Sequence, residues 1–165
     1  MKHADPQAGR PQGPQAAATA AQAAPDRPGR AGFRHFQSII TRWMDNDAYG
    51  HVNNVVYYSY FDTAVNCYMI ERGVLDYNTS REICYVVESG CRYFAPLAFP
   101  QTVDAGIRIS RLGNSSVRYE IGLFAQGSDE PAAFGHFVHV CVDRQTQRPI
   151  PLPAALRAAL EPLVV

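Results

Sequence analysis

One stretch of ten residues concentrates the side chains that acid-base and nucleophilic chemistry requires. It runs from Asp45 to Asn54 and holds two carboxylates, Asp45 and Asp47, and the imidazole of His51. A segment with helical periodicity follows, so the stretch is expected to lead into a helix N-terminus. Free N–H groups there can hold the oxygen of a polarised carbonyl, while a nearby carboxylate attacks its carbon or activates a water. These parts suffice for acyl transfer, particularly from a thioester, whose thiol leaves readily as thiolate.

The same residues also have a structural interpretation. Asp, Asn and Gly are common in turns and at helix N-caps, because their side chains bond nearby backbone groups or tolerate unusual backbone angles. On composition alone, Asp45 and Asn53 are expected to be turn and cap residues. The residue types by themselves therefore leave the site open.

Longer segments of the sequence give a more specific indication of the family. The segment Asp47-Ala48-Tyr49-Gly50-His51-Val52-Asn53-Asn54, followed by residues 57–62, resembles the opening of the hotdog-fold acyl-CoA thioesterases of the 4-hydroxybenzoyl-CoA thioesterase type. Residues 113–120 are similar to a later strand of that family, and the resemblance extends from Phe33 to about Asp143. It implies a hotdog fold that hydrolyses an acyl-CoA thioester to free acid and CoA, and no cofactor is expected. It also implies a homodimer or a tetramer of dimers, with active sites at the subunit boundary.

The resemblance assigns three catalytic positions. The family's catalytic aspartate falls on Asp47, either as a nucleophile that forms an acyl-enzyme anhydride or as the base for a water. The amide that polarises the thioester carbonyl falls near Asn54, on the first helical turn. His51 is expected to have a hydrogen-bonding role rather than an indispensable one, and Asp45 is assigned to loop structure.

Further residues are candidates for substrate binding. Arg111 is placed to meet a CoA phosphate, Tyr57 to line an acyl or aryl pocket, and each also fits a structural role, as a solvated strand end or as core. The binding candidates are Asn53, Tyr57, Arg111, Ser115 and Ser116, the two serines being next to a predicted hairpin turn.

The sequence offers little support for a metal site or a disulfide framework. His136 and His139 are three positions apart on a predicted strand, so they are expected on opposite faces, which disfavours a shared metal. The four cysteines lack a C-x-x-C pair and are expected to be free thiols.

Other functions remain open at this stage. Acyl-carrier-protein thioesterases resemble the same His-Val-Asn-Asn string but have Asn where Asp47 stands, so carrier-protein substrates are an alternative. A second alternative is a hotdog module that binds or senses acyl-CoA without turnover. A hydratase is disfavoured because no Asp/His dyad at hydratase spacing follows Asp47, and a DNA-binding repressor because no helix-turn-helix pattern precedes the domain.

The elements that must position the site follow from hydrophobic periodicity. Residues 36–43 are β-branched and aromatic, which predicts a strand entering the Asp/Asn/Gly-rich loop. Residues 55–72 predict one long helix, enclosed by a sheet on much of its circumference and ended at Gly73. Period-two patterns over 83–94, 102–110, 116–123 and 132–142 predict strands, interrupted once near Gly90, and a short helix is expected near the C-terminus. This order predicts an α+β fold with a largely antiparallel sheet of about five strands across the helix.

Composition limits the domain organisation, the partners and the location that can be expected. The chain has 165 residues and its 18 aromatic residues all lie at or after Phe33. Residues 1–32 include 23 Ala, Pro, Gln or Gly, which predicts a disordered tail before a hotdog domain over residues 33–165. Fifteen basic residues balance fifteen acidic ones, which argues against nucleic acid and membrane surfaces as partners. The longest apolar runs are too short to span a bilayer and no secretory signal is evident, so a cytoplasmic location is expected.

Overall fold

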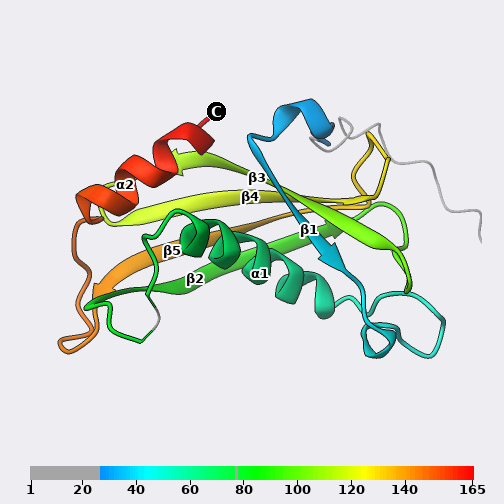
Figure 1. Ribbon diagram of the computed structural model, residues 1–165, viewed down its shortest axis with the longest axis horizontal. Helices are drawn as coiled ribbons and strands as arrows, with labels where there is room; N and C mark the ends of the chain where they lie inside the picture. Colours follow the sequence, from blue (N-terminus) through cyan, green and yellow to red (C-terminus); the bar gives the residue numbers. More distant parts are fainter. Residues whose placement is uncertain (1–26, 77) are drawn as a thin grey trace, which may run out of the picture.

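The computed structural model describes residues 27–76 and 78–165 (Figure 1). In this part of the chain, one long helix lies across one face of a five-stranded sheet. The elements are β1 (His35–Ile40), α1 (Val56–Glu71), β2 (Glu82–Tyr93), β3 (Thr102–Leu112), β4 (Ser116–Ala125), β5 (Ala133–Asp143) and α2 (Ala154–Leu160), with short 3-10 turns at Arg30–Gly32, Trp43–Asp45 and Glu161–Leu163. The predicted hotdog architecture is confirmed.

All neighbouring strands pair antiparallel, in the order β1-β3-β4-β5-β2. The two strands beside α1 in sequence, β1 and β2, therefore end up at opposite edges of the sheet. β3, β4 and β5 are consecutive and form the centre, where Ile107, Ile121 and Phe137 point into the core under α1. The edges matter for function because the N–H and C=O groups on the outer side of β2 have no neighbouring strand within the described residues.

One stripe of α1 packs on the sheet. Tyr57, Tyr60, Phe61, Ala64, Val65, Tyr68 and Met69 are buried at i, i+3, i+4 spacing. The opposite side carries exposed residues, among them Asp62, Thr63 and Ile70. The predicted long helix packed against an antiparallel sheet of five strands is confirmed, although the strands of one chain cover only one side of it.

Three predicted boundaries also need correction. β1 ends at Ile40, because the chain leaves the sheet and turns at Trp43–Asp45. The helix begins at Val56, one residue later than predicted, because the preceding residues form a turn. β2 continues through Gly90 without interruption, since that glycine leaves room for the His136 ring, which an added Cβ would approach to 2.6 Å. The irregularity in β2 is instead a bulge between Val86 and Glu88.

The N-terminal segment reaches the sheet earlier than predicted. Most of the predicted 1–32 tail lies outside the described residues, but Arg30 already pairs with Asp104 on β3 at 2.6 Å, and its guanidinium lies over the Phe36 ring. Phe33 follows and covers Gly106 and Gly122, two glycines paired across β3 and β4. Ordered contacts with the domain thus begin before Phe33, on the face of the sheet away from α1.

No helix in the described part of the chain is both long enough and apolar enough to cross a bilayer.

Candidate functional site

The Asp45–Asn54 stretch forms a compact loop between β1 and α1. Its two arms pair through backbone hydrogen bonds, from Asp47 N to His51 O at 2.7 Å and from Asn53 N to Asp45 O at 2.8 Å. The turn closes at Gly50, whose φ of 80° is readily adopted only without a side chain. A bond from Val52 N to Leu97 O ties the loop to the segment after β2.

Asp47 is half-buried in this loop. Its Oδ1 accepts the backbone N–H groups of Tyr49 at 2.8 Å and His51 at 3.3 Å. No residue in the described ranges bonds its second oxygen, Oδ2, so that atom remains available to a substrate or water. The carboxylate borders a hollow of about 250 Å³, also lined by Trp43, Asn46, Ala48 and Gly50.

Asp45 differs sharply from its neighbour. It is buried, and its carboxylate accepts bonds from Arg42 N at 2.7 Å, from the Arg42 guanidinium and from the Tyr60 hydroxyl at 2.8 Å. Burial alone would raise the pKa of Asp45, but the bonds from Arg42 and Tyr60 outweigh it and hold that pKa below its usual value. These contacts agree with the structural role predicted for Asp45.

The backbone N–H groups at the turn before α1 differ in their bonding among the described residues. The side chain of Asn53 accepts Val55 N at 3.2 Å, and its carbonyl accepts Val56 N at 2.9 Å. The N–H of Asn54 has no acceptor among the described residues. Asn54 lies two positions before the helix rather than on its first turn, because the turn at 54 and 55 precedes Val56.

Two tyrosines, Tyr57 and Tyr93, contact each other beside this turn, and one of them bonds to it. Tyr57 is buried and meets Tyr93 edge to face at 4.9 Å, and the Tyr93 hydroxyl donates to Asn54 O at 3.0 Å. Burial raises the pKa of Tyr57, and the nearby Asp47 charge adds to the effect. The loop therefore lies at the Tyr93 end of β2.

The remaining binding candidates lie at the other end of the sheet. Ser116 is level with Val140 on β5 and, one strand further, with Tyr85 on β2. Ser115 O accepts Cys141 N at 2.8 Å, and Arg111 is exposed near the same hairpin. Tyr85 and Tyr93 are eight residues apart on one strand, about 25 Å. A single chain thus does not bring Arg111, Ser115 or Ser116 to Asp47.

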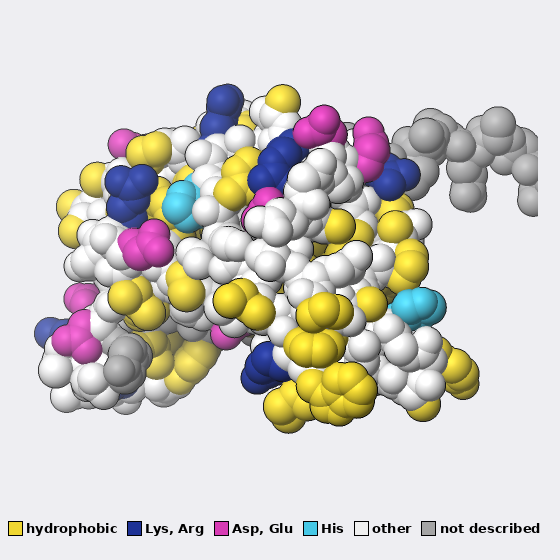
Figure 2. Space-filling view, turned by 45° about the vertical axis from the view of Figure 1, so that its right-hand side comes forward, with side chains coloured by type: hydrophobic (Ala, Val, Ile, Leu, Met, Phe, Trp, Pro, Cys, Tyr) yellow, Lys and Arg dark blue, Asp and Glu magenta, His cyan; other side chains and the backbone are white. Residues whose placement is uncertain are grey.

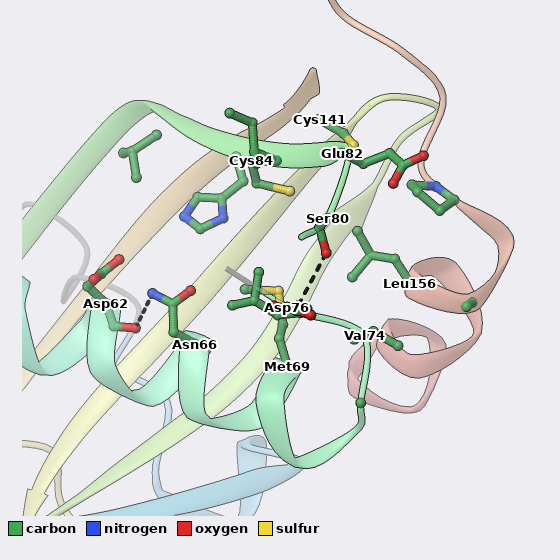
Figure 3. Close-up of a pocket in the computed structure, with 17 residues that line it drawn as sticks. Asp62, Asn66, Met69, Val74, Asp76, Ser80, Glu82, Cys84, Cys141 and Leu156 are labelled. Carbon is green, nitrogen blue, oxygen red and sulfur yellow. Dashed lines mark hydrogen bonds between the residues drawn. The ribbon is translucent and has the colours of Figure 1, made fainter. Parts of the chain in front are cut away.

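A second cavity lies at that far end, bounded by α1, the segment after it, β2, β5 and α2 (Figure 3). It encloses about 340 Å³. Asp62 and Asn66 face it from α1, and Cys84 and Cys141 face it from the sheet. Burial raises the pKa of Cys84 to about 12, which keeps it a protonated thiol. All four cysteines are unpaired.

His139 also lines this cavity, and sequence reasoning assigned it no role. Its exposed fraction is 4%, and neither ring nitrogen has a hydrogen-bond partner among the described residues. Burial lowers its pKa, so the ring is neutral near pH 7. His136, three residues earlier, lies on the other face and bonds Glu88 at 2.9 Å. The sequence places His139 among the apolar residues of a predicted strand, which does not distinguish it from an ordinary core residue.

Residues 27–76 and 78–165 contain no group of three His, Cys, Asp or Glu side chains placed to hold a metal ion.

Apolar side chains surround the Asp47 loop on the outside. Trp43, Met44 and Tyr49 each expose three quarters or more of their area. Figure 2 shows hydrophobic side chains gathered at the lower edge of the molecule, on the side of this loop. Single exposed apolar residues are ordinary, but a group of this size beside a candidate site is typical of an interface.

Comparisons with known proteins agree with this architecture. Residues 41–160 match the model of the Thioesterase-like superfamily. The crystal structure of the PA5185 protein from Pseudomonas aeruginosa strain PAO1 is 57% identical, with a TM-score of 0.82 over 84% of this chain and 96% of that one. The PA2801 protein from Pseudomonas aeruginosa is 33% identical, with a TM-score of 0.72 over 77% and 98%.

A third structure carries a ligand. A thioesterase from Thermus thermophilus, complexed with coenzyme A and Zn, is 32% identical to this chain, with a TM-score of 0.66 over 80% of this chain and 95% of that one. No curated protein matches the chain. The family match covers most of the chain and includes the whole Asp45–Asn54 loop, so the chain belongs to the Thioesterase-like superfamily and has its hotdog fold.

Proposed function

We propose that this protein hydrolyses an acyl-CoA thioester, with Asp47 as the reacting carboxylate and the Asn54 N–H as the donor to the thioester oxygen. One observation carries the proposal: Asp47 Oδ2 and Asn54 N lie in one loop braced by backbone pairing, and neither has a partner among the described residues. The match to the Thioesterase-like superfamily supports the reaction class, and the coenzyme A bound to the Thermus thioesterase supports CoA as the carrier.

The chemistry follows two routes from this arrangement. As a base, Asp47 takes a proton from a water whose oxygen attacks the thioester carbon; as a nucleophile, its oxygen attacks directly and water later cleaves the anhydride. In both routes the carbonyl oxygen gains negative charge, which the Asn54 N–H stabilises. The carbon–sulfur bond then breaks and CoA leaves as thiolate.

We further propose that the complete site forms between two copies of this chain. β2 is an edge strand of twelve residues, and Tyr85, Val86, Val87 and Tyr93 on it are substantially exposed. If two β2 strands pair antiparallel about a twofold axis near their middle, the Tyr93 end of one meets the Glu82 end of the other. The Asp47 loop of each copy then faces the cavity and the 111–116 hairpin of its partner. In this dimer, Asp47 of one copy would lie near Arg111, Ser115 and Ser116 of the other, although these residues are at opposite ends of the sheet within one chain.

The test measures thiol release from a panel of acyl-CoAs that includes hexanoyl-CoA, benzoyl-CoA and 4-hydroxybenzoyl-CoA, with an acyl carrier protein thioester alongside. We expect CoA thioesters to be hydrolysed, and Asp47→Asn to lower kcat/KM by about a thousandfold. Asp129→Asn, which changes an exposed carboxylate outside the Asp45–Asn54 loop, is the control and should retain activity.

Three results would contradict parts of this proposal. An Asp47→Asn protein as active as the parent would remove Asp47 from its role. A preference for the carrier-protein thioester would show that acyl carrier protein, and not CoA, carries the acyl group of the substrate. Tight binding of acyl-CoA without thiol release from the unmodified protein would favour a binding module. Sedimentation velocity tests the dimer separately, since a monomer at micromolar concentration would contradict pairing through β2.

A further inference from the structure

Two cysteines face each other across β2 and β5. Cys84 on β2 is directly opposite Cys141 on β5 in the antiparallel register. Residues opposite each other in such a pair have their side chains on the same face of the sheet. Both cysteines line the cavity at the Glu82 end of β2, where Figure 3 shows them on the sheet. The two thiols are in hydrogen-bond contact with each other.

The backbone hydrogen bonds of Cys141 show which kind of pair this is. Cys141 N donates to Ser115 O at 2.8 Å, and Cys141 O accepts Ile150 N at 3.0 Å. Both backbone groups of Cys141 therefore point away from β2, which makes Cys84 and Cys141 a non-hydrogen-bonded pair. The Cα atoms of such a pair are about 4.5 Å apart. A disulfide spans Cα atoms about 4.4–6.8 Å apart, so this pair can accept one without separating the strands.

The other two cysteines lack this arrangement. Cys91, further along β2, is opposite Gly135. Cys67 is on α1 and does not line the cavity. Within the pair, Cys84 is partly exposed and Cys141 is buried. A small reagent that enters the cavity is therefore expected to reach Cys84 first.

From this geometry we propose that Cys84 and Cys141 are a redox-modification site, at which a peroxide converts the two thiols into a disulfide that joins β2 to β5. The Cys84 thiolate attacks hydrogen peroxide: a sulfur–oxygen bond forms, the oxygen–oxygen bond breaks and hydroxide leaves. The Cys141 thiolate then attacks the sulfur of this sulfenic acid, the sulfur–oxygen bond breaks and a second hydroxide leaves. The two protons given up by the thiols convert both hydroxides to water. Two thiols are thus oxidised to one disulfide, and one peroxide is reduced to two waters.

The surroundings of the two thiols set the rate of this reaction. Burial raises the pKa of both thiols, that of Cys84 to about 12. The other titratable side chains that line the cavity are Asp62, Asp76, Glu82 and His139, and the described lining residues include no Lys or Arg. Because the thiolate is the reacting form, the first step is slow near pH 7 and accelerates as the pH rises. The second step is faster, since Cys141 is already held against the sulfenic acid.

The disulfide fastens an edge strand to its neighbour. Among the described residues β2 pairs only with β5, and a bulge between Val86 and Glu88 separates its Glu82 end from the rest of the strand. A link at Cys84 holds this short end in register. It also closes a long loop of chain, which removes conformational entropy from the unfolded state. The oxidised protein is therefore more stable than the reduced one.

The experiment uses a Cys67→Ser/Cys91→Ser double variant, which retains only the proposed pair. It is treated with hydrogen peroxide at about pH 7, 8 and 9, and thiols are counted after denaturation. Both thiols should disappear together, with loss of two hydrogen atoms from the protein mass and a peptide link between Cys84 and Cys141. The rate should rise about tenfold per pH unit, as the thiolate fraction does. The melting temperature should rise by about 5–15 °C and return with dithiothreitol.

Cys84→Ser and Cys141→Ser, made in the same background, are the matched controls. Each leaves one thiol and cannot form the disulfide, so peroxide should not raise its melting temperature. The unmodified protein is treated in parallel, and peptide mapping reads its Cys84–Cys141 link directly. The test therefore does not depend on how well any variant folds.

Three results would overturn the proposal. The first is a gain of two oxygen atoms as sulfinic acid on Cys84 or Cys141 in place of the disulfide. The second is a disulfide between two copies of the chain on a non-reducing gel, and the third is a pair of thiols that survives peroxide at about pH 9. None of these measurements uses an acyl-CoA, so their outcome is independent of the proposed function.

Discussion

The hydroxyl of Tyr60 on α1 donates a 2.8 Å hydrogen bond to the buried carboxylate of Asp45, two residues before Asp47. This bond joins the long helix to the loop that carries the candidate site. Arg42 holds the other side of the same carboxylate. The loop that carries Asp47 is therefore tied to α1 through the neighbouring carboxylate of Asp45.

Replacing Tyr60 by Phe should weaken that connection. The change removes the hydroxyl and leaves a buried charged acceptor short of one bond, which is expected to lower the free energy of unfolding by about 1.5–3 kcal/mol. Urea unfolding measures the effect, with Tyr49→Phe as the control because Tyr49 is 86% exposed. Equal stability of the two variants would show that the Asp45–Tyr60 bond does not brace the loop.

The Asn54 N–H can be tested by removing the atom itself. Asn54→Pro lacks this N–H and should lower kcat by about a hundredfold or more, as loss of an oxyanion donor does. Asn54→Ala keeps the backbone donor and should retain most activity. Circular dichroism must report the same helix content and melting for both variants, and an active, folded Asn54→Pro protein would exclude this N–H as the donor.

Acid should weaken the fold through Asp143 at the end of β5. Backbone bonds, led by that from Thr146, together with the Arg81 guanidinium, lower the pKa of Asp143 to about 2. Because the folded pKa is lower than the unfolded value of about 3.9, its contribution is fully present above about pH 4 and is lost as the pH falls towards about 2. The difference in unfolding free energy between the parent and Asp143→Asn should thus be constant near neutrality and shrink below about pH 4. Asp129→Asn is the control, and a pH-independent difference would disprove the linkage.

The contact of Phe33 with Gly122 should be visible in a double-mutant cycle. A Cβ at Gly122 would lie 2.6 Å from Phe33 Cζ, so Gly122→Ala should cost about 1–3 kcal/mol through overpacking. Phe33→Ala should cost about 3–5 kcal/mol. Since the first clash needs the Phe33 ring, the double variant should lose less than the sum. Strict additivity, measured by denaturant unfolding, would mean that residues around Phe33 do not pack on the sheet in solution.

Mixing two inactive variants tests whether the site is shared between subunits. Asp47→Asn removes the reacting carboxylate, and Asn66→Trp fills the cavity at the other end of the chain. Refolding them together in equal amounts gives half heterodimers, each with one intact site, so about a quarter of parental activity should return. Each variant refolded alone is the control. If the site lies within one chain, the mixture will stay inactive.

Much of this molecule is determined by the order of its residues alone. Alternating patterns predict the strands, helical spacing predicts α1, and the turn residues between Asp45 and Asn54 fix the loop that carries Asp47, because all of these depend on neighbours close in sequence. Resemblance gives Asp45 and Asp47, two positions apart, different expected roles, and the fold gives their carboxylates different hydrogen bonds.

Other features were decided only by tertiary structure. Residue order offers no reason to distinguish His139 from an ordinary core residue, because the shielding of its unbonded nitrogens arises only once β5 packs against its neighbours in the fold. Likewise, Arg111, Ser115 and Ser116 were grouped with Asp47 in the sequence, whereas strand order places them at the opposite end of the sheet. Periodicity specifies which face of a strand or helix a side chain occupies. The distances between residues on different faces, or at different ends of the sheet, depend on strand order and register, which are set by pairing between strands far apart in sequence.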